Sequence, residues 1–128
     1  MPQRRTRRRM RGVHRVLLVD DHRWFRSMAR TMLEGDRFTV VAEAASVAEA
    51  LVALGAHRPD LVVLDVMLGD GTAFDVLAVM GEAMPSTVLV SSRAAEAYGD
   101  RMAEYGAVVG FLVKDDLDPD ALGRLVAS

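Results

Sequence analysis

The chain has 128 residues, enough for one domain with a substantial core, and about half of them are apolar while few are aromatic. It contains no cysteine, which excludes a disulfide framework, a thiol nucleophile and a cysteine-ligated zinc site. No apolar run approaches the length of a transmembrane helix, so we expect no membrane partner.

The net charge of −2 joins two regions of opposite sign. Residues 1–12 contain six arginines and no acidic residue, which leaves ten basic and 18 acidic side chains in the rest of the chain. Because residues 1–12 have almost nothing to bury, we expect them to be disordered. We interpret this Arg-rich arm as a solvated tail, with contact to nucleic acid or another acidic surface as the alternative.

From residue 13 onward, short apolar runs alternate with stretches that have apolar residues at helical spacing. The apolar runs are typical of buried strands and cover residues 16–19, 38–41, 61–65, 87–90 and 109–113. Helices are predicted between and after them: over 24–33, after Ser46, after Thr72, over about 94–105 and after Asp118. Five strands alternating with five helices predict one α/β domain over residues 13–128, with a parallel sheet covered on both faces.

Capping residues support three of the helix starts. Ser46 is followed three residues later by Glu49, which predicts a capping box, and Thr72 can cap the next helix. Pro119, directly after Asp118, occupies a position that proline favours in the first turn of a helix.

Polar side chains stand at the ends of four predicted strands. They are Asp20 and Asp21 after the first strand, Asp65 at the third, Ser91 and Ser92 at the fourth, and Lys114 at the fifth. Because the carboxyl ends of parallel strands lie along one edge of the sheet, we expect these groups to converge. Any one of them could be only a helix cap, a turn former or a solvated lysine, so the inference depends on all four strand ends together.

This combination predicts phosphoryl chemistry at a metal site. Neighbouring carboxylates raise each other's pKa unless a cation offsets them, and Mg²⁺ suits a site made of oxygen ligands. A carboxylate beside Mg²⁺ can act as a nucleophile toward a phosphoryl group, while the metal and a lysine offset the charge of its oxygens. Lys114 is the only lysine in the chain.

Three motifs resemble the receiver domain of bacterial response regulators: Leu-Val-Asp-Asp-His at 18–22, Val-Val-Leu-Asp at 62–65 and Gly-Phe-Leu-Val-Lys-Asp at 110–115. The resemblance covers residues 13–128, and the Asp-Asp-His opening and Lys-Asp ending are most similar to receivers of NarL/LuxR-type regulators. It implies a flavodoxin-like (βα)5 fold, a doubly wound parallel sheet with strand order 2-1-3-4-5. It also implies a cytoplasmic protein of two-component signal transduction.

The resemblance implies that Asp65 accepts a phosphoryl group from the phosphohistidine of a sensor histidine kinase. Asp21, Asp65 and the backbone carbonyl of Met67 would bind Mg²⁺ directly, and Asp20 would bind it through water. Lys114 would contact the phosphoryl group. No enzymatic activity is implied beyond the domain's own phosphorylation and dephosphorylation.

The resemblance further implies a switch, in which a hydroxyl at the end of the fourth strand bonds to the phosphoryl group and Phe111 turns inward. Counting back from Lys114 selects Ser92 as this hydroxyl, which we prefer. Counting from the other side selects Ser91, because residues 106–110 hold one residue more than usual. Phe111 is equally interpretable as a plain core residue.

The implied output is a shift in the face formed by the fourth helix, fifth strand and fifth helix. This face would serve homodimerisation. Contact with DNA is expected only through an output domain outside this sequence or through the Arg-rich arm.

Departures from the family pattern keep a second interpretation open. Gly69 stands where the family commonly has proline, Ala73 where it has glycine, and Arg93 follows Ser92 where a small residue is usual. The alternative is a pseudo-receiver that is not phosphorylated and acts as a protein-binding module. A Mg²⁺-dependent phosphatase has less support, because Met67 stands where such enzymes have a second aspartate. No Gly-rich fingerprint follows the first strand, which argues against a dinucleotide site.

Overall fold

A computed structural model describes residues 12–94 and 97–127, so residues 1–11 of the predicted arm lie outside the described residues. Its centre is a five-stranded sheet in the order β2-β1-β3-β6-β7, in which all neighbours pair in parallel. The strands are β1 (His14–Val19), β2 (Phe38–Ala44), β3 (Leu61–Asp65), β6 (Ser86–Ser91) and β7 (Val108–Val113). The predicted fold and the strand order 2-1-3-4-5 are therefore confirmed.

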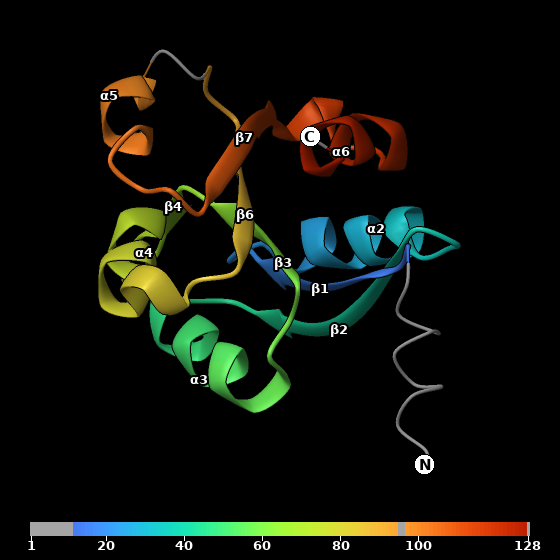
Figure 1. Cartoon of the computed structure of the whole chain (residues 1–128), viewed down its shortest axis with the longest axis horizontal. Coiled ribbons are helices and arrows are strands. Elements are labelled where there is room, and N and C mark those ends of the chain that lie inside the picture. The colour runs from blue at the N-terminus through green and yellow to red at the C-terminus, as the bar shows by residue number, and fades with distance from the viewer. Residues whose placement is uncertain (1–11, 95–96, 128) are drawn as a thin grey trace.

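Helices cover both faces of this sheet (Figure 1). They are α2 (Arg23–Leu33), α3 (Val47–His57), α4 (Ala73–Met80), α5 (Gly99–Met102) and α6 (Pro119–Val126). Two short 3-10 helices, η1 (Gly81–Ala83) and η3 (Lys114–Asp116), and an antiparallel pair, β4 (Met67–Leu68) with β5 (Gly71–Thr72), lie in the connections. No helix among the described residues is long and apolar enough to cross a membrane.

Alternate strand residues divide the core into two layers. Leu17, Val62 and Leu64 belong to the layer under α3, α4 and α5, whereas Leu18 and Val63 belong to the layer under α2 and α6. Strands that are buried on both faces are expected to read as continuous apolar runs, and this sequence does so. The helices pack on these two apolar layers, and the polar side chains lie at the carboxyl ends of the strands.

The predicted capping residues are confirmed at three helices. The Ser46 hydroxyl accepts from the Glu49 N–H at 3.1 Å, although Glu49 in turn accepts from Ala45 rather than from Ser46. Thr72 forms a complete capping box with Asp75. At the start of α6, the Asp118 carboxylate accepts from the Ala121 N–H, and Pro119 lies in the first turn.

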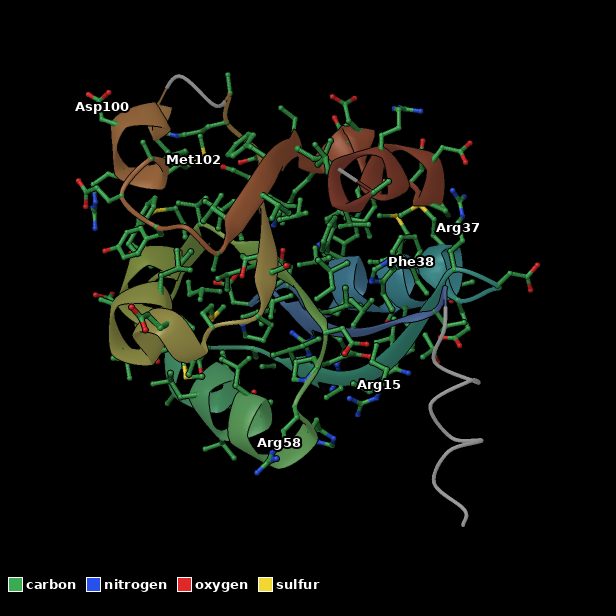
Figure 2. The ribbon with its side chains drawn as sticks, in the orientation of Figure 1. Arg15, Arg37, Phe38, Arg58, Asp100 and Met102 are labelled. Carbon is green, nitrogen blue, oxygen red and sulfur yellow. The ribbon has the colours of Figure 1, made fainter. Side chains whose placement is uncertain are left out.

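The helix predicted over 94–105 is much shorter, because α5 comprises only Gly99–Met102 and residues 95–96 lie outside the described residues. A glycine in a helix interior costs about 1 kcal/mol relative to alanine, and Gly99 would lie in the middle of the predicted helix. Figure 2 shows Met102 of α5 directed toward the sheet and Asp100 directed outward. Contacts with the core thus fix this segment where helix propensity does not.

The extra residue noted between 106 and 110 forms an irregularity in β7. Thr87 pairs with Val108, but the next residue, Val88, pairs with Gly110, so Val109 is the inserted residue. A Cβ at Gly110 would lie 2.7 Å from both methyl carbons of Leu125, so a larger residue here would require the Leu125 side chain to move.

Candidate functional site

The carboxyl ends of β1, β3 and β7 bring Asp20, Asp65 and Lys114 together. The Lys114 Nζ lies 2.6 Å from Asp20 Oδ2 and 3.2 Å from Asp65 Oδ2. Both carboxylates are buried, and Lys114 is the partner of Asp20 Oδ2 among the described residues. One ammonium group therefore faces two buried carboxylates, which leaves the site short of positive charge.

This arrangement shifts the protonation of both partners. Burial raises the pKa of Asp65 to about 6, repulsion from Asp20 adds to the rise, and Lys114 and the Met67 N–H oppose it. Burial alone would lower the pKa of Lys114, but hydrogen bonding to Asp20 and the charges of both carboxylates raise it overall. Asp65 is consequently ionised for the most part at neutral pH, but the ionised form is unfavourable without further positive charge.

His22 also belongs to the site, which the sequence prediction missed. Its Nδ1 lies 3.2 Å from Asp20 Oδ1 and 3.2 Å from Asp21 Oδ1. One ligand atom from each of Asp20, Asp21, His22 and Asp65 lies within 4.8 Å of all the others. The position of His22 directly after the two aspartates could have indicated this role, but the sequence does not show the direction in which the ring points. This donor set fits a divalent cation.

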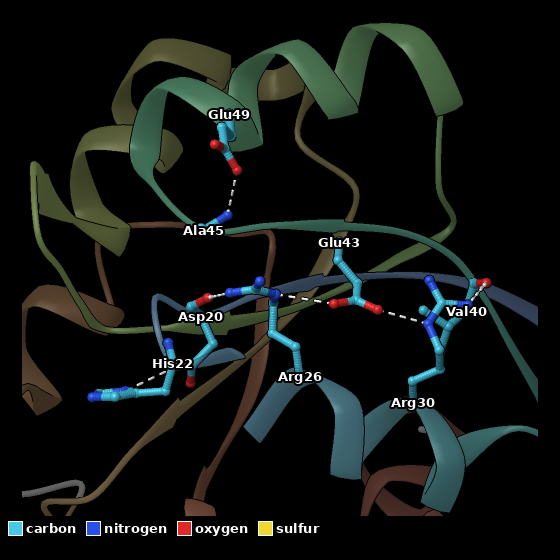
Figure 3. A network of polar contacts seen from close by, with 8 residues as sticks. All are labelled: Asp20, His22, Arg26, Arg30, Val40, Glu43, Ala45 and Glu49. Carbon is cyan, nitrogen blue, oxygen red and sulfur yellow. Dashed lines mark hydrogen bonds and ion pairs between the residues drawn. The ribbon is translucent and has the colours of Figure 1, made fainter. Parts of the chain in front are cut away.

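Arginines of α2 hold the loop that carries the acid pair (Figure 3). Arg26 donates from Nη1 to the carbonyl of Asp20 at 2.6 Å and from Nε to Glu43 at 3.0 Å. Arg30 donates to the other oxygen of Glu43 at 2.6 Å, and the Asp20 N–H donates to the Ala44 carbonyl. The loop is thereby tied to both α2 and β2. These residues lie far apart in sequence, and nothing in their local pattern predicted the contact.

A hollow of about 230 Å³ opens above Asp65, and we call it the acidic hollow. It is lined by Asp21, His22, Asp65, Met67, Leu68, Gly69, Ser91, Ser92, Arg93, Tyr98 and Lys114. Asp20 lies beneath it, fully buried, and the Met67 side chain is exposed at its rim. The structure therefore brings together every residue predicted for phosphoryl and metal chemistry.

The two candidate switch serines differ in their surroundings. Ser91 is only 2% exposed, pairs with Val113 immediately before Lys114, and accepts from the Arg93 N–H at 3.0 Å. Ser92 is exposed. The inserted Val109 adds one residue between this loop and Lys114, so a count back from Lys114 that allows for the insertion reaches Ser91 instead of Ser92.

Phe111 is half-buried and lies beside the tilted ring of Tyr98, which the sequence prediction did not single out. The rings of Phe111 and Tyr98 lie 6.3 Å apart between centroids, and Tyr98 lies 6.4 Å from Phe74. Because Tyr98 also lines the acidic hollow, it links the hollow to the core under α4.

Comparisons with known proteins agree with this geometry. Residues 16–126 match the family model for the response regulator receiver domain. The DNA-binding transcriptional activator DevR/DosR of Mycobacterium tuberculosis is 39% identical over 105 residues, which cover 79% of this chain and 48% of that protein. The chemotaxis protein CheY of Bacillus subtilis is 42% identical over 55 residues, covering 43% of this chain and 46% of that protein.

A solved structure supports the same assignment. A two-component response regulator of the LuxR family from Aurantimonas sp. SI85-9A1 superposes with a TM-score of 0.77 at 26% identity, over 90% of this chain and 83% of that one. The chain spans about half the length of the first curated relative it matches. With its sheet order, its acidic hollow and a family match over nearly all described residues, the chain belongs to the response regulator receiver domains of two-component signalling.

Proposed function

We propose that this receiver accepts a phosphoryl group on Asp65 from a sensor histidine kinase, in a reaction that requires a divalent cation. The observation that carries the proposal is the position of Asp65. Its carboxylate lies at the floor of the acidic hollow, 3.2 Å from the Lys114 ammonium and within 4.8 Å of ligand atoms of Asp21 and His22.

In the proposed reaction, an Asp65 carboxylate oxygen attacks the phosphorus of a phosphohistidine. A P–O bond forms, the P–N bond to the kinase breaks, and its electron pair stays on the imidazole nitrogen. Lys114 contacts an oxygen of the transferred group and offsets its charge. Asp20, Asp21, Asp65 and the Met67 backbone carbonyl would hold a cation such as Mg²⁺, which supplies the positive charge that the hollow lacks.

We propose Ser91 rather than Ser92 as the hydroxyl that reads the phosphoryl group. Ser91 is buried beside the hollow, and its hydroxyl can keep accepting from Arg93 or turn to donate to a phosphoryl oxygen. Loss of the Arg93 contact would release the chain that leads to Tyr98. Phe111 would then follow the Tyr98 ring that it contacts.

The partners follow from this switch. The affected face comprises α5, β7 and α6, and we propose it as the surface through which a loaded receiver meets a second copy. The named relative DevR/DosR is a DNA-binding activator about twice as long as the matched region. By analogy, we propose that DNA is reached through an output domain rather than through the receiver.

The alternative function is a pseudo-receiver that binds proteins without being phosphorylated. Arg93 supports this alternative, because its side chain lines the acidic hollow and could obstruct the approach of a kinase to Asp65. Gly69 and Ala73 depart from the family pattern in the loop that follows Asp65.

Mass spectrometry of the intact chain separates the two functions. The chain is incubated with a small phosphodonor, or with beryllium fluoride, in the presence and absence of Mg²⁺. We expect one adduct on the wild type only with Mg²⁺ and none on Asp65→Asn. The matched control is Asp36→Asn, at an exposed aspartate between α2 and β2, and its adduct should be unchanged. No adduct on the wild type with either reagent would favour the pseudo-receiver.

A further inference from the structure

The imidazole of His22 is placed in a way that helix capping does not explain. His22 is the residue that precedes α2, yet its side chain makes no capping hydrogen bond to the helix. Instead, its backbone N–H donates to Asp20 Oδ1 at 2.8 Å, and its ring Nδ1 faces the acid pair. Backbone and ring together hold the nitrogen against the two carboxylates.

The spacing suits two ligands on adjacent corners of one coordination sphere. Metal–ligand distances of about 2.1 Å place neighbouring ligands of an octahedron about 3 Å apart. The Nδ1 lies 3.2 Å from Asp20 Oδ1 and 3.2 Å from Asp21 Oδ1, so all three atoms can face one cation with small adjustments.

Lys114 does not compete for the same oxygen. The ammonium contacts Oδ2 of Asp20 and Oδ2 of Asp65, whereas His22 contacts Oδ1 of Asp20. The Asp20 carboxylate is therefore shared, with one oxygen turned to the lysine and the other to the imidazole. The ring is 58% exposed, so the proton on its other nitrogen can remain solvated.

Building on the proposed function, we propose that His22 binds the cation of this receiver through Nδ1, and that the hollow consequently prefers a transition-metal dication such as Mn²⁺, Co²⁺ or Ni²⁺ over Mg²⁺. The affinity of a site with nitrogen and oxygen ligands rises from Mn²⁺ through Co²⁺ to Ni²⁺, and imidazole nitrogen suits the later members of this series best. Mg²⁺ favours oxygen ligands and keeps several waters. A nitrogen donor therefore adds affinity for the first class and little for the second.

The other role for the ring is that of a hydrogen-bond donor to the two carboxylates. In that case a bound cation would displace the contact, and loss of the imidazole would leave the preference between Mn²⁺ and Mg²⁺ unchanged. The two roles thus differ in whether a nitrogen atom of His22 is bound to the metal ion.

Pulsed electron paramagnetic resonance of Mn²⁺ bound to the whole chain tests the proposal, because it detects nitrogen in the coordination sphere without any phosphorylation assay. The variants are His22→Gln and, as matched control, His57→Gln, an exposed histidine at the end of α3. We expect nitrogen modulation in the wild type and in His57→Gln, and none in His22→Gln. Competition titrations should show Mn²⁺ affinity falling about tenfold or more in His22→Gln, since even partners of metal ligands contribute that much. Mg²⁺ affinity should change far less.

The outcomes separate this inference from the proposed function. Mn²⁺ that binds, is lost in Asp65→Asn, and shows no nitrogen modulation would overturn the role of His22 and leave the phosphoryl-acceptor proposal standing. Modulation that persists in His22→Gln would overturn it equally. Absence of any Mn²⁺ or Mg²⁺ binding to the wild type would overturn both.

Discussion

Two loops border the acidic hollow, and they are attached to the rest of the fold in different ways. The acceptor loop, residues 66–72, follows Asp65 and is hydrogen-bonded to several other elements. The response segment, described over residues 92–94 and 97–102, follows Ser91, and its described hydrogen bonds are all local. The difference indicates that Asp65, the proposed phosphoryl acceptor, is held in a fixed position, whereas the segment proposed to respond to it can be repacked at lower cost.

The acceptor loop is tied at both ends and in the middle. The Val66 N–H donates to the Val90 carbonyl at 2.9 Å, and the Ala73 N–H donates back to the Val66 carbonyl at 2.8 Å. The Asp70 carboxylate accepts from the N–H groups of Val47 and Ala48 at 2.8 and 3.2 Å, which docks the loop on the start of α3. Gly69 in place of the family's proline therefore does not leave this loop without support.

Ring contacts, by contrast, fasten the response segment. Tyr98 contacts Phe74 and Phe111, and the Arg101 guanidinium lies 4.2 Å from the centre of the Phe74 ring. Such contacts have broad geometric preferences and can be exchanged for neighbouring arrangements more readily than a hydrogen-bonded loop.

The largest expected effect is on the free energy of unfolding and comes from the buried carboxylate of Asp65. Because the pKa of Asp65 is raised from 3.8 to about 6, the folded state binds this proton more tightly than the unfolded state. The stability that this group contributes is therefore full below pH 4 and is lost as the pH rises through 6. Without divalent cations, Asp65→Asn should exceed the wild type by about 3 kcal/mol in free energy of unfolding above pH 7. Urea unfolding at several pH values measures the difference.

Two features of that experiment check its cause. Adding Mg²⁺ should shrink the gap between Asp65→Asn and the wild type, because a cation stabilises the ionised carboxylate. A gap that is the same at pH 4 and pH 8 would show that the substitution acts through packing and not through charge.

A smaller effect is expected from the rings of the response segment. Tyr98→Ala removes contacts with two rings and should lower the free energy of unfolding by about 2 kcal/mol, while phosphoryl loading of Asp65 continues. The matched control is Tyr105→Ala, which loses a contact with Phe74 but none with Phe111. If loading fails in Tyr98→Ala while the variant remains folded, the two loops are not separable in the way we describe.

Substitution of Asp70 should have the smallest effect on the free energy of unfolding, but it should slow the formation of an adduct on Asp65. The Val47 N–H holds the pKa of Asp70 below its ordinary value; burial opposes this shift and the Ala48 N–H adds to it. Asp70→Ala should slow adduct formation on Asp65 and lower cation affinity, because the Met67 carbonyl loses its fixed position. Trp24, the only tryptophan in the chain, lies three residues after Asp21. Stopped-flow measurement of its fluorescence with a small phosphodonor compares Asp70→Ala with Asp36→Ala. Equal rates of adduct formation in Asp70→Ala and Asp36→Ala would contradict the role that we assign to the contact between Asp70 and α3.

Much of the site was predictable because it depends on strand ends. Apolar runs define the strands, parallel pairing aligns their carboxyl ends, and Asp65 and Lys114 must then meet even though 49 positions separate them in the sequence. Contacts that depend on tertiary packing were not predictable. The docking of Asp70 on α3, the direction of the His22 ring and the place of Val109 in the register have no local signature.

The shortening of α5 has a similar explanation. Residues 94–105 contain good helix formers, but Gly99 weakens the helix. Tyr98, which directly precedes α5, lies next to two aromatic rings. Such neighbours become known only once β7 and α4 are in place.

Hydrogen–deuterium exchange with and without beryllium fluoride and Mg²⁺ tests the central claim most directly, since it follows both loops in one experiment. We predict that loading changes exchange severalfold over residues 92–94 and 97–102 and leaves residues 66–72 nearly unchanged. Ser91→Ala should abolish the change in the response segment, and Ser92→Ala should keep it. Equal changes in both loops, or a change confined to residues 66–72, would contradict the account.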